Sequence, residues 1–377
     1  MKHLSKFLPF LGAGISWQVL TALPQPVGNH TLEAGFETLI ADDIHVIDSV
    51  LIYSLENGSW EYDLTLGAGY ISLDYVPAAV DAFFHREERL TEDRLSAELA
   101  LTRKATEHLD WSLTLGGYDG FTGYRSLWIS NWYQLNFEGF PGLEEPSPHG
   151  YYGSSGLRWH YRPGTGVLQS AFTWAQETIA PAFDEVFNEF GALTGVAPLR
   201  SELETYAWQI STENVLSARL RTHLEYRLAK QSERELRQSL VGRAHFTLLD
   251  RWFLQLRGGG TYEAGGEEAA RDFKAWWGAA TVLWEMNEHW TWDLGTGFYR
   301  DNGEIENSIG FSSAAPGLKS WSTQAGVRYF RGPHAFRLSV GWREATYGET
   351  DFENQFFEGL YRSRDFFTTS ISYRLNF

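Results

Sequence analysis

From residue 31 to the end of the chain, hydrophobic and polar side chains alternate in short segments, separated by turn-forming or strongly polar stretches. Successive side chains of a β-strand point to opposite faces, so each segment predicts a strand with one apolar and one polar face. The strands are predicted at 31–39, 45–55, 59–74, 91–104, 109–121, 150–162, 166–179, 201–213, 217–231, 233–249, 251–263, 270–286, 289–301, 319–331, 334–347 and 362–377. The pattern therefore predicts about sixteen strands.

The segment 217–231 shows the two faces clearly. Leu220, Leu224 and Leu228 share one face. The opposite face carries Arg219, Arg221, His223, Glu225 and Arg227. A face with so many charged groups cannot pack against a dry core without a large desolvation cost, so it must face water or a polar interior.

The connections between the segments alternate between short turns and longer polar loops. Short turns are predicted at 56–59, 105–108, 162–166, 213–216, 249–251, 286–289 and 331–334. The longer stretches are 75–90, 122–149, 180–200, 264–269, 302–318 and 348–361. A two-sheet sandwich has no reason to alternate in this way, whereas an up-and-down β-barrel gathers its turns at one end and its loops at the other.

One loop contains a different pattern. Between residues 126 and 137, Trp128, Trp132 and Leu135 recur at helical spacing, and a further strand here would make the number of strands odd. We expect a short helix inside this loop. It could fold into the lumen and narrow it or cap the rim of the barrel, and we expect the second arrangement.

The last strand carries a recognisable ending. Tyr373, Leu375 and Phe377 lie on one face, and the chain ends on the phenylalanine. This ending resembles the C-terminal insertion signal of Gram-negative outer-membrane β-barrel proteins, which the barrel assembly machinery reads. The resemblance implies an all-β fold, a transmembrane antiparallel up-and-down barrel with short periplasmic turns and long extracellular loops in the bacterial cell outer membrane. The competing interpretation is the edge strand of a soluble sandwich.

The composition fits a membrane barrel. The chain has 377 residues with 16 Trp, 18 Tyr and 25 Phe, and such aromatic residues form girdles at the two membrane interfaces. Five Trp residues lie on the apolar phase close to predicted turns, namely Trp60, Trp111, Trp252, Trp290 and Trp292. No apolar stretch after the amino terminus is long enough for a transmembrane helix, so a membrane role requires strands.

The amino terminus, residues 1–22, has the features of a weak signal peptide. Lys2 and Lys6 precede an apolar run that ends near Ala22. Leu20 occupies a position where a small residue is expected before cleavage, so the alternative is a mature amphipathic segment packed on or in the barrel. On the first interpretation, residues 23–377 form the barrel domain.

The charge is distributed unevenly. The net charge of −17 argues against a nucleic-acid partner, yet the inward faces of the predicted strands are rich in arginine. The residues predicted to line the lumen and set its charge selectivity are Arg219, Arg221, Arg227, Glu225, Arg243, Arg328, Arg337, Arg343 and Arg374. Rings of arginine favour anions, whereas arginines paired with acidic residues on neighbouring strands would only stiffen the wall.

Inward glycines at 67, 69, 295 and 297 are expected to permit curvature or close packing.

These features predict an outer-membrane channel for passive diffusion of small hydrophilic solutes, with anions as a candidate class. The alternative is a structural or assembly barrel that anchors a periplasmic or extracellular partner, with its lumen closed by loops. A barrel hydrolase would need a Ser–His pair, and the sequence contains no nucleophile-elbow, metal-binding or cofactor-binding motif. We therefore predict no enzyme activity, no cofactor and no metal. The expected partners are outer-membrane lipid, lipopolysaccharide and the assembly machinery, and a homo-oligomer is left open.

Overall fold

The computed structural model describes residues 30–75, 88–178, 183–198, 202–232, 235–265, 272–303, 316–348 and 359–377. The predicted signal peptide, residues 1–22, lies outside these described residues. No helix in this part of the chain is long and apolar enough to cross a membrane.

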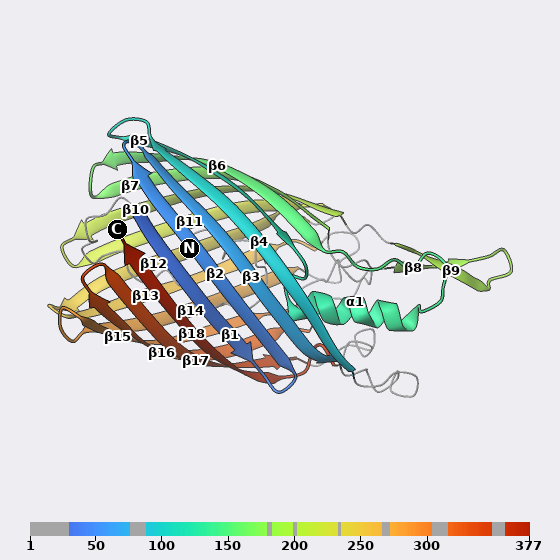
Figure 1. The fold of residues 1–377 in the computed structure, drawn as a ribbon. Helices are drawn as coiled ribbons and strands as arrows, with labels where there is room; N and C mark the ends of the chain where they lie inside the picture. The colour runs from blue at the N-terminus through green and yellow to red at the C-terminus, as the bar shows by residue number, and fades with distance from the viewer. Residues whose placement is uncertain are drawn as a thin grey trace.

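Sixteen strands form one closed antiparallel barrel (Figure 1). The first eight are β1 (His30–Ile40), β2 (Ile44–Asn57), β3 (Trp60–Tyr75), β4 (Glu88–Lys104), β5 (Leu109–Asp119), β6 (His149–Arg162), β7 (Gly166–Thr178) and β10 (Glu202–Ser217). The second eight are β11 (Leu220–Gln231), β12 (Arg237–Leu249), β13 (Trp252–Glu263), β14 (Phe273–Glu285), β15 (Trp290–Asp301), β16 (Leu318–Arg331), β17 (His334–Tyr347) and β18 (Arg364–Asn376). The predicted number and order of barrel strands are therefore confirmed.

The barrel closes where the last strand meets the first. β18 pairs with β1 from Thr31 opposite Asn376 to Ile40 opposite Phe367. The backbones of His30 and Phe377 exchange two further hydrogen bonds of 3.0 and 3.1 Å. Closure leaves the barrel without an open sheet edge, so every strand has two hydrogen-bonded neighbours.

The two ends of the barrel differ. At one end, which we call the turn end, strands such as β2 and β3 or β16 and β17 are joined by two to four residues. The other end, which we call the loop end, carries helix α1 (Tyr124–Asn136) and a two-stranded hairpin of β8 (Phe183–Phe187) and β9 (Leu193–Pro198). Figure 1 shows both elements at the same end of the barrel, with the hairpin extending well beyond the strands. The hairpin was not predicted from the sequence.

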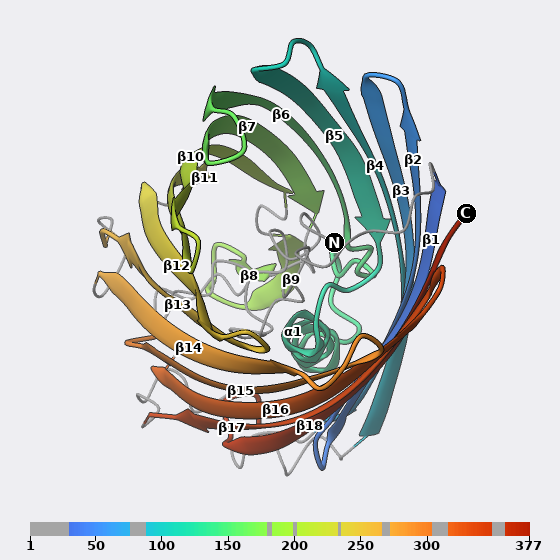
Figure 2. The same ribbon diagram turned by 90° about the vertical axis from the view of Figure 1, so that its left-hand side faces the viewer.

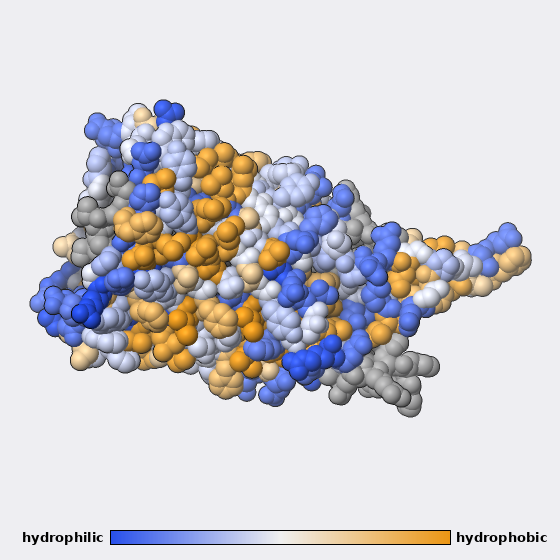
Figure 3. Space-filling view, in the orientation of Figure 1, coloured by the Kyte–Doolittle hydropathy of each residue, from blue (hydrophilic) through white to orange (hydrophobic). Residues whose placement is uncertain are grey.

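The outer surface of the barrel carries an apolar band. Large side chains at alternate positions are exposed on neighbouring strands, including Leu224 at 50%, Leu240 at 50% and Val340 at 52%. Orange patches cover the middle of the barrel wall in the space-filling view, and hydrophilic residues gather toward both ends (Figure 3). A soluble protein could not leave such an area in contact with water, so the band faces the hydrocarbon core of a membrane.

The predicted tryptophans lie at the turn end of this band. Trp252, Trp290 and Trp292 are exposed by 40%, 39% and 47%, and the ring of Trp252 stacks on Trp284 with a centroid distance of 5.6 Å. Each ring offers an apolar body to lipid and an N–H group to headgroups or water. The expected aromatic girdle is therefore present at this end.

One predicted turn is wrong. The turn expected at 213–216 lies instead between Ser217 and Leu220, because β10 continues as a paired strand with a bulge near Val215. The Val215 N–H donates to the Thr165 carbonyl, which extends the ladder toward the turn end. Arg219 therefore lies in an exposed two-residue turn, not within a strand.

Candidate functional site: the lumen wall and the helix at its mouth

The inner phase of the strands carries the predicted lumen residues, with the exception of Arg219. Arg221, Glu225 and Arg227 occupy the positions of β11 that alternate with the exposed Leu224. The remaining predicted residues lie on the corresponding phase of their strands, namely Arg243 on β12, Arg328 on β16, Arg337 and Arg343 on β17, and Arg374 on β18. The structure thus distributes them around the wall and does not gather them into one ring.

The insertion-signal residues occupy the outer phase of β18. Phe377 is 58% exposed and its ring stacks on His30 at 5.4 Å. The Tyr373 hydroxyl lies 2.7 Å from Nδ1 of His334, and Leu375 pairs with the same histidine across the strands. These three side chains therefore cover the closing seam at the turn end, next to the aromatic girdle.

Arginines on the inner wall form ion pairs with acidic residues of nearby strands. The guanidinium of Arg374 lies 2.6 Å from the Glu33 carboxylate across the seam. Arg237 lies 2.6 Å from Glu263 on the adjacent strand. In these pairs the guanidinium groups act as struts between strands, as in the second of the two roles considered for the arginines.

Two further ion pairs join strands that are separated by one intervening strand. Arg94 of β4 reaches Asp48 of β2 at 2.5 Å, and Gly69 of β3 lies in the same row between them. A Cβ atom at Gly69 would lie 2.4 Å from Asp48 Oδ1 and 2.5 Å from Arg94 Nε. Only a residue without a side chain lets the guanidinium cross the middle strand, so the close-packing role expected of this glycine is confirmed. Arg337 of β17 reaches Asp293 of β15 at 3.4 Å.

Two tyrosine side chains also reach an acid two strands away by passing over a glycine of the strand between. The Tyr152 hydroxyl of β6 donates to Glu98 of β4 at 2.6 Å, and Gly116 of β5 lies in the row between them. A Cβ atom at Gly116 would lie 2.4 Å from the Tyr152 ring. The Tyr118 hydroxyl, which crosses β6, donates to Glu177 at 2.8 Å. Carboxylates on the inner wall of β2 to β7 are therefore held by long side chains that lie flat along the wall.

The opposite wall, β11 to β13, carries a surplus of positive charge. Arg243 of β12 lies directly opposite Arg257 of β13 and opposite His223 of β11. One step toward the turn end, Arg221 pairs with His245 across the strands and lies 3.5 Å from Glu213. Cations thus stand directly opposite one another across three neighbouring strands of this wall.

Water reaches the inner wall. The side chain of Asp48 is 40% exposed, that of Arg374 is 44% exposed and that of Arg221 is 50% exposed. All three point away from the outer apolar band, so their exposed surface faces the interior of the barrel. Sixteen strands enclose a space that wall side chains do not fill.

Helix α1 lies inside the ring of strands at the loop end, close to the wall (Figure 2). Trp128 and Ile129 are each 1% exposed, and they belong to an apolar cluster that includes Ile44 and Val46 of β2. Other wall members of this cluster are Ile71, Leu73 and Tyr75 of β3 and Phe366 of β18. Helix α1 therefore packs against the inner side of the rim, where the inner face of β2 and β3 changes from polar to apolar and provides a dry surface, and it extends beyond the ends of the strands (Figure 1).

Polar contacts fix the amino-terminal end of this helix. The Arg125 guanidinium donates to the Tyr347 hydroxyl and lies 5.5 Å from the centroid of the same ring. The Tyr124 ring lies 6.4 Å from that of Phe366. The helix is thus tied to β17 and β18 as well as packed on β2 and β3.

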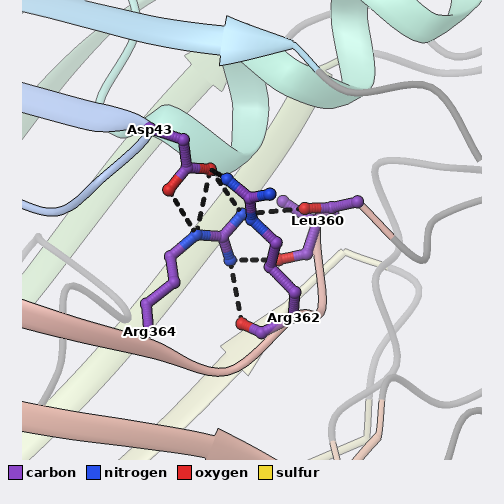
Figure 4. A network of polar contacts seen from close by, with 5 residues as sticks. Asp43, Leu360, Arg362 and Arg364 are labelled. Atoms are coloured by element: carbon purple, nitrogen blue, oxygen red, sulfur yellow. Dashed lines mark hydrogen bonds and ion pairs between the residues drawn. The ribbon is translucent and has the colours of Figure 1, made fainter.

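A buried ion-pair network joins the same region to the closing seam (Figure 4). Asp43, in the β1–β2 turn, accepts hydrogen bonds from Arg364 at 3.0 to 3.1 Å and forms an ion pair with Arg362 at 2.6 Å. Arg364 also donates to the carbonyls of Gly359 and Leu360. Burial acts to raise the pKa of Asp43, but the hydrogen bonds and charges of Arg364, followed by those of Arg362, outweigh it and lower the pKa below 3.8.

The β8–β9 hairpin is linked to the segment that follows α1. The Val196 N–H donates to the Pro141 carbonyl at 2.8 Å, and Val196 joins the apolar cluster around the helix. At the hairpin tip, the Asn188 side chain accepts hydrogen bonds from the backbone N–H groups of Phe190 and Ala192. Helix and hairpin are therefore connected parts of one assembly at the loop end.

No family model matches the sequence, and no curated protein matches it. Solved structures of similar fold were found. A structure described as a bacterial polysaccharide outer membrane secretin has a TM-score of 0.51 at 10% identity, covering 93% of this chain and 99% of the other. A TodX deltaS2S3 mutant monoaromatic hydrocarbon channel has a TM-score of 0.50 at 12% identity, with coverages of 94% and 91%. CdiB from Acinetobacter baumannii has a TM-score of 0.51 at 11% identity, covering 92% of this chain and 61% of that chain.

At these identities the similarity concerns the fold. The closed sixteen-strand barrel, its apolar outer band and its aromatic girdle define a β-barrel protein of the bacterial outer membrane. Its polar, water-accessible inner wall makes the barrel channel-like.

Sequence reasoning missed two acceptors of the inner wall. Asp48 and Glu177 were not predicted to face the lumen, although each stands in a row with a glycine on the neighbouring strand. The helix position also had a signal, since Ile71 and Leu73 continue the inward phase that is polar at Asp63 and Thr65. No pattern in the sequence pointed to the Asp43 network, because it joins segments more than three hundred residues apart.

Proposed function

We propose that the protein is an outer-membrane channel for passive diffusion of small hydrophilic solutes. The observation that supports this most is the inner wall of charged and hydroxyl side chains, which water reaches at Asp48, Arg221 and Arg374. A water-filled path lined by such groups lowers the cost of moving a hydrated solute across the membrane. Helix α1 narrows this path at the loop end and sets an upper limit on solute size.

The charge of the wall favours a modest preference for anions. The row of His223, Arg243 and Arg257 and the nearby Arg221 raise the local concentration of anions on one side of the lumen. Ion pairs hold some arginines of this wall as well, since Arg221 lies 3.5 Å from Glu213 and Arg237 lies 2.6 Å from Glu263. The inner faces of β11 to β13 nevertheless carry more arginines than acids, so we expect the selectivity to come from this part of the wall.

The similar solved structures are described as a polysaccharide secretin, a monoaromatic hydrocarbon channel and CdiB. The first two descriptions name an outer membrane secretin and a channel, and they differ in the compound that they name. They agree with a transport role for this chain. The composition of its own lumen wall is what favours a hydrophilic solute.

The test is the conductance of the refolded protein in a planar bilayer with a salt gradient. We expect discrete open-channel steps and a reversal potential on the anion side. Arg243→Gln combined with Arg257→Gln should move the reversal potential toward cations, whereas the paired variant Arg237→Gln with Glu263→Gln should leave it nearly unchanged. Absence of any conductance from folded protein would contradict the proposal, and unaltered selectivity in the first variant would assign those arginines to the wall structure.

The second candidate function is an anchoring or assembly barrel. It is favoured by the linked α1 and hairpin at the loop end, because Phe190 is held at the hairpin tip with 86% of its surface exposed. An exposed aromatic on an ordered turn is suited to contact another protein. A folded protein that never conducts but loses a partner on Phe190→Ser would support this function instead.

A further inference from the structure

A group of cations lies on the membrane-facing side of the barrel at the loop end. Lys274 of β14, Arg300 of β15 and Lys319 of β16 are all exposed and lie on the outer phase of three consecutive strands. Arg300 and Lys319 are directly opposite each other in the strand register. Because the chain has a net charge of −17, a group of three cations at one place on its surface suggests an anionic ligand.

Their height on the barrel follows from β15. Its outer phase runs from Trp290 at the turn end through Leu294 to Phe298, and Arg300 is the next outward residue. Eight residues of strand span about 26 Å, or about 20 Å along the axis of a barrel whose strands tilt by about 40°. The apolar band of such barrels is about 25 Å tall. Arg300 therefore emerges where hydrocarbon gives way to headgroups.

An aromatic layer lies directly below the cations. The Phe298 ring lies 4.7 Å from Trp276 and 5.2 Å from Trp321, and these two tryptophans are 53% and 55% exposed. Contiguous aromatic rings mark the membrane interface. The two outward positions beyond them, Arg300 and Lys319, face the headgroup layer of that leaflet.

The local charges leave a net positive patch. Lys274 lies 3.6 Å from the half-buried Asp272 and 5.9 Å from the Tyr262 ring. No residue in the described part of the chain forms an ion pair with Arg300 or Lys319. The patch ends at β17, where Glu344 lies opposite Trp321. Two like charges directly opposite each other are destabilising unless an anion lies between them.

We propose that Lys274, Arg300 and Lys319 form a binding site for the phosphorylated saccharide headgroup of lipopolysaccharide. Short turns face the periplasm in barrels of this class, so the loop end faces outward and its leaflet is the one that contains lipopolysaccharide. The arginine can hold a phosphate through two parallel hydrogen bonds, and the lysines add point charges on either side. The acyl chains lie along the Trp276, Phe298 and Trp321 surface below. This site does not depend on whether the barrel conducts.

The test uses full-length folded protein in neutral detergent micelles, titrated with bisphosphorylated lipid A and followed by native mass spectrometry. Arg300→Gln combined with Lys319→Gln should weaken binding by about tenfold, since two charge-assisted contacts are lost. The matched control is Arg103→Gln with Arg331→Gln, which removes two exposed cations at the turn end and should leave binding unchanged. Heat-modifiable gel migration confirms that each variant is folded. If the double variant does not fold, the single variant Arg300→Gln is used in its place.

Three further ligands distinguish the source of the phosphate. Dephosphorylated lipid A should bind the native protein about as weakly as lipid A binds the double variant. Phosphatidylglycerol and inorganic phosphate should bind more weakly than lipid A and compete poorly with it. Equal binding of the two lipid A forms, or unchanged binding in the double variant, would overturn the site. Phosphatidylglycerol binding as tightly as lipid A, with the same sensitivity to the variant, would overturn the assignment to a saccharide headgroup.

Discussion

Glycine residues on the inner wall decide which polar side chains can meet. Gly69 lies between Asp48 and Arg94, and Gly116 lies between Glu98 and Tyr152. In each row the missing side chain opens a path for a long side chain two strands away. The acid is thereby hydrogen-bonded within the wall, and less of its charge is presented to solutes in the lumen.

Gly69→Ala should therefore destabilise the barrel by about 1–3 kcal/mol, the usual cost of overpacking. The added Cβ would clash with the Asp48 carboxylate and the Arg94 guanidinium. The cost should largely disappear in the background Arg94→Ser, and a double-mutant cycle from urea unfolding in lipid vesicles measures this coupling. Gly242→Ala is the control, because nothing lies within 4 Å of a Cβ at that site. Equal effects of Gly69→Ala in both backgrounds would contradict the proposed crossing.

The Asp43 network gives a pH dependence at the loop end. Because the pKa of Asp43 is lowered in the folded protein, its stabilising contribution is complete above about pH 3.8 and is lost as the pH falls through the lower folded value. We expect the single-channel current of the native protein to be steady at neutral pH. It should fluctuate only in strong acid, where protonation of Asp43 loosens the loop end. The current through Asp43→Asn should fluctuate already at neutral pH. A current as steady as that of the native protein at pH 7 would show that the network does not hold this end together.

At the scale of elements, helix α1 is held in one position, because its contacts are apolar and buried. Trp128, Ile129 and Tyr133 are each exposed by no more than 2%. The wall beneath them is apolar only where the helix lies, so a helix released into the lumen would leave Ile44 and Leu73 facing water. Both surfaces favour the docked position.

Trp128→Ala with Tyr133→Ala should loosen the helix, since each large-to-small change in a packed core costs about 3–5 kcal/mol. We expect larger or fluctuating single-channel conductance with an unchanged apparent barrel stability in gel-shift assays. Gln134→Ala, on the half-buried side of the same helix, should behave like the native protein. A conductance identical to that of the native protein in the double variant would mean that α1 does not limit the path.

At the scale of the whole molecule, period-two alternation predicted the strands and their order, and the alternation of short turns with long loops, together with the aromatic C-terminal strand, predicted that they form a barrel. Each strand has one face in lipid, and a single-residue shift of register would bring Arg337 or Arg243 into the apolar band. The inner arrangement was less predictable. The bulge near Val215 moved Arg219 out of the wall, and the docking of α1 depends on side chains from strands distant in the sequence. Such contacts leave no periodic signal.

If the barrel conducts, one face of every strand lines the water-filled path and the other faces lipid. The native chain contains no cysteine, so a single introduced cysteine can be modified selectively. Ser239 and Leu240 are neighbours in β12, on the inner and outer phases. A charged thiol reagent added during single-channel recording should reduce the current through Ser239→Cys and leave Leu240→Cys unaffected. A reduced current through Leu240→Cys, or an unchanged current through both variants in channels that conduct, would contradict this assignment of the two faces.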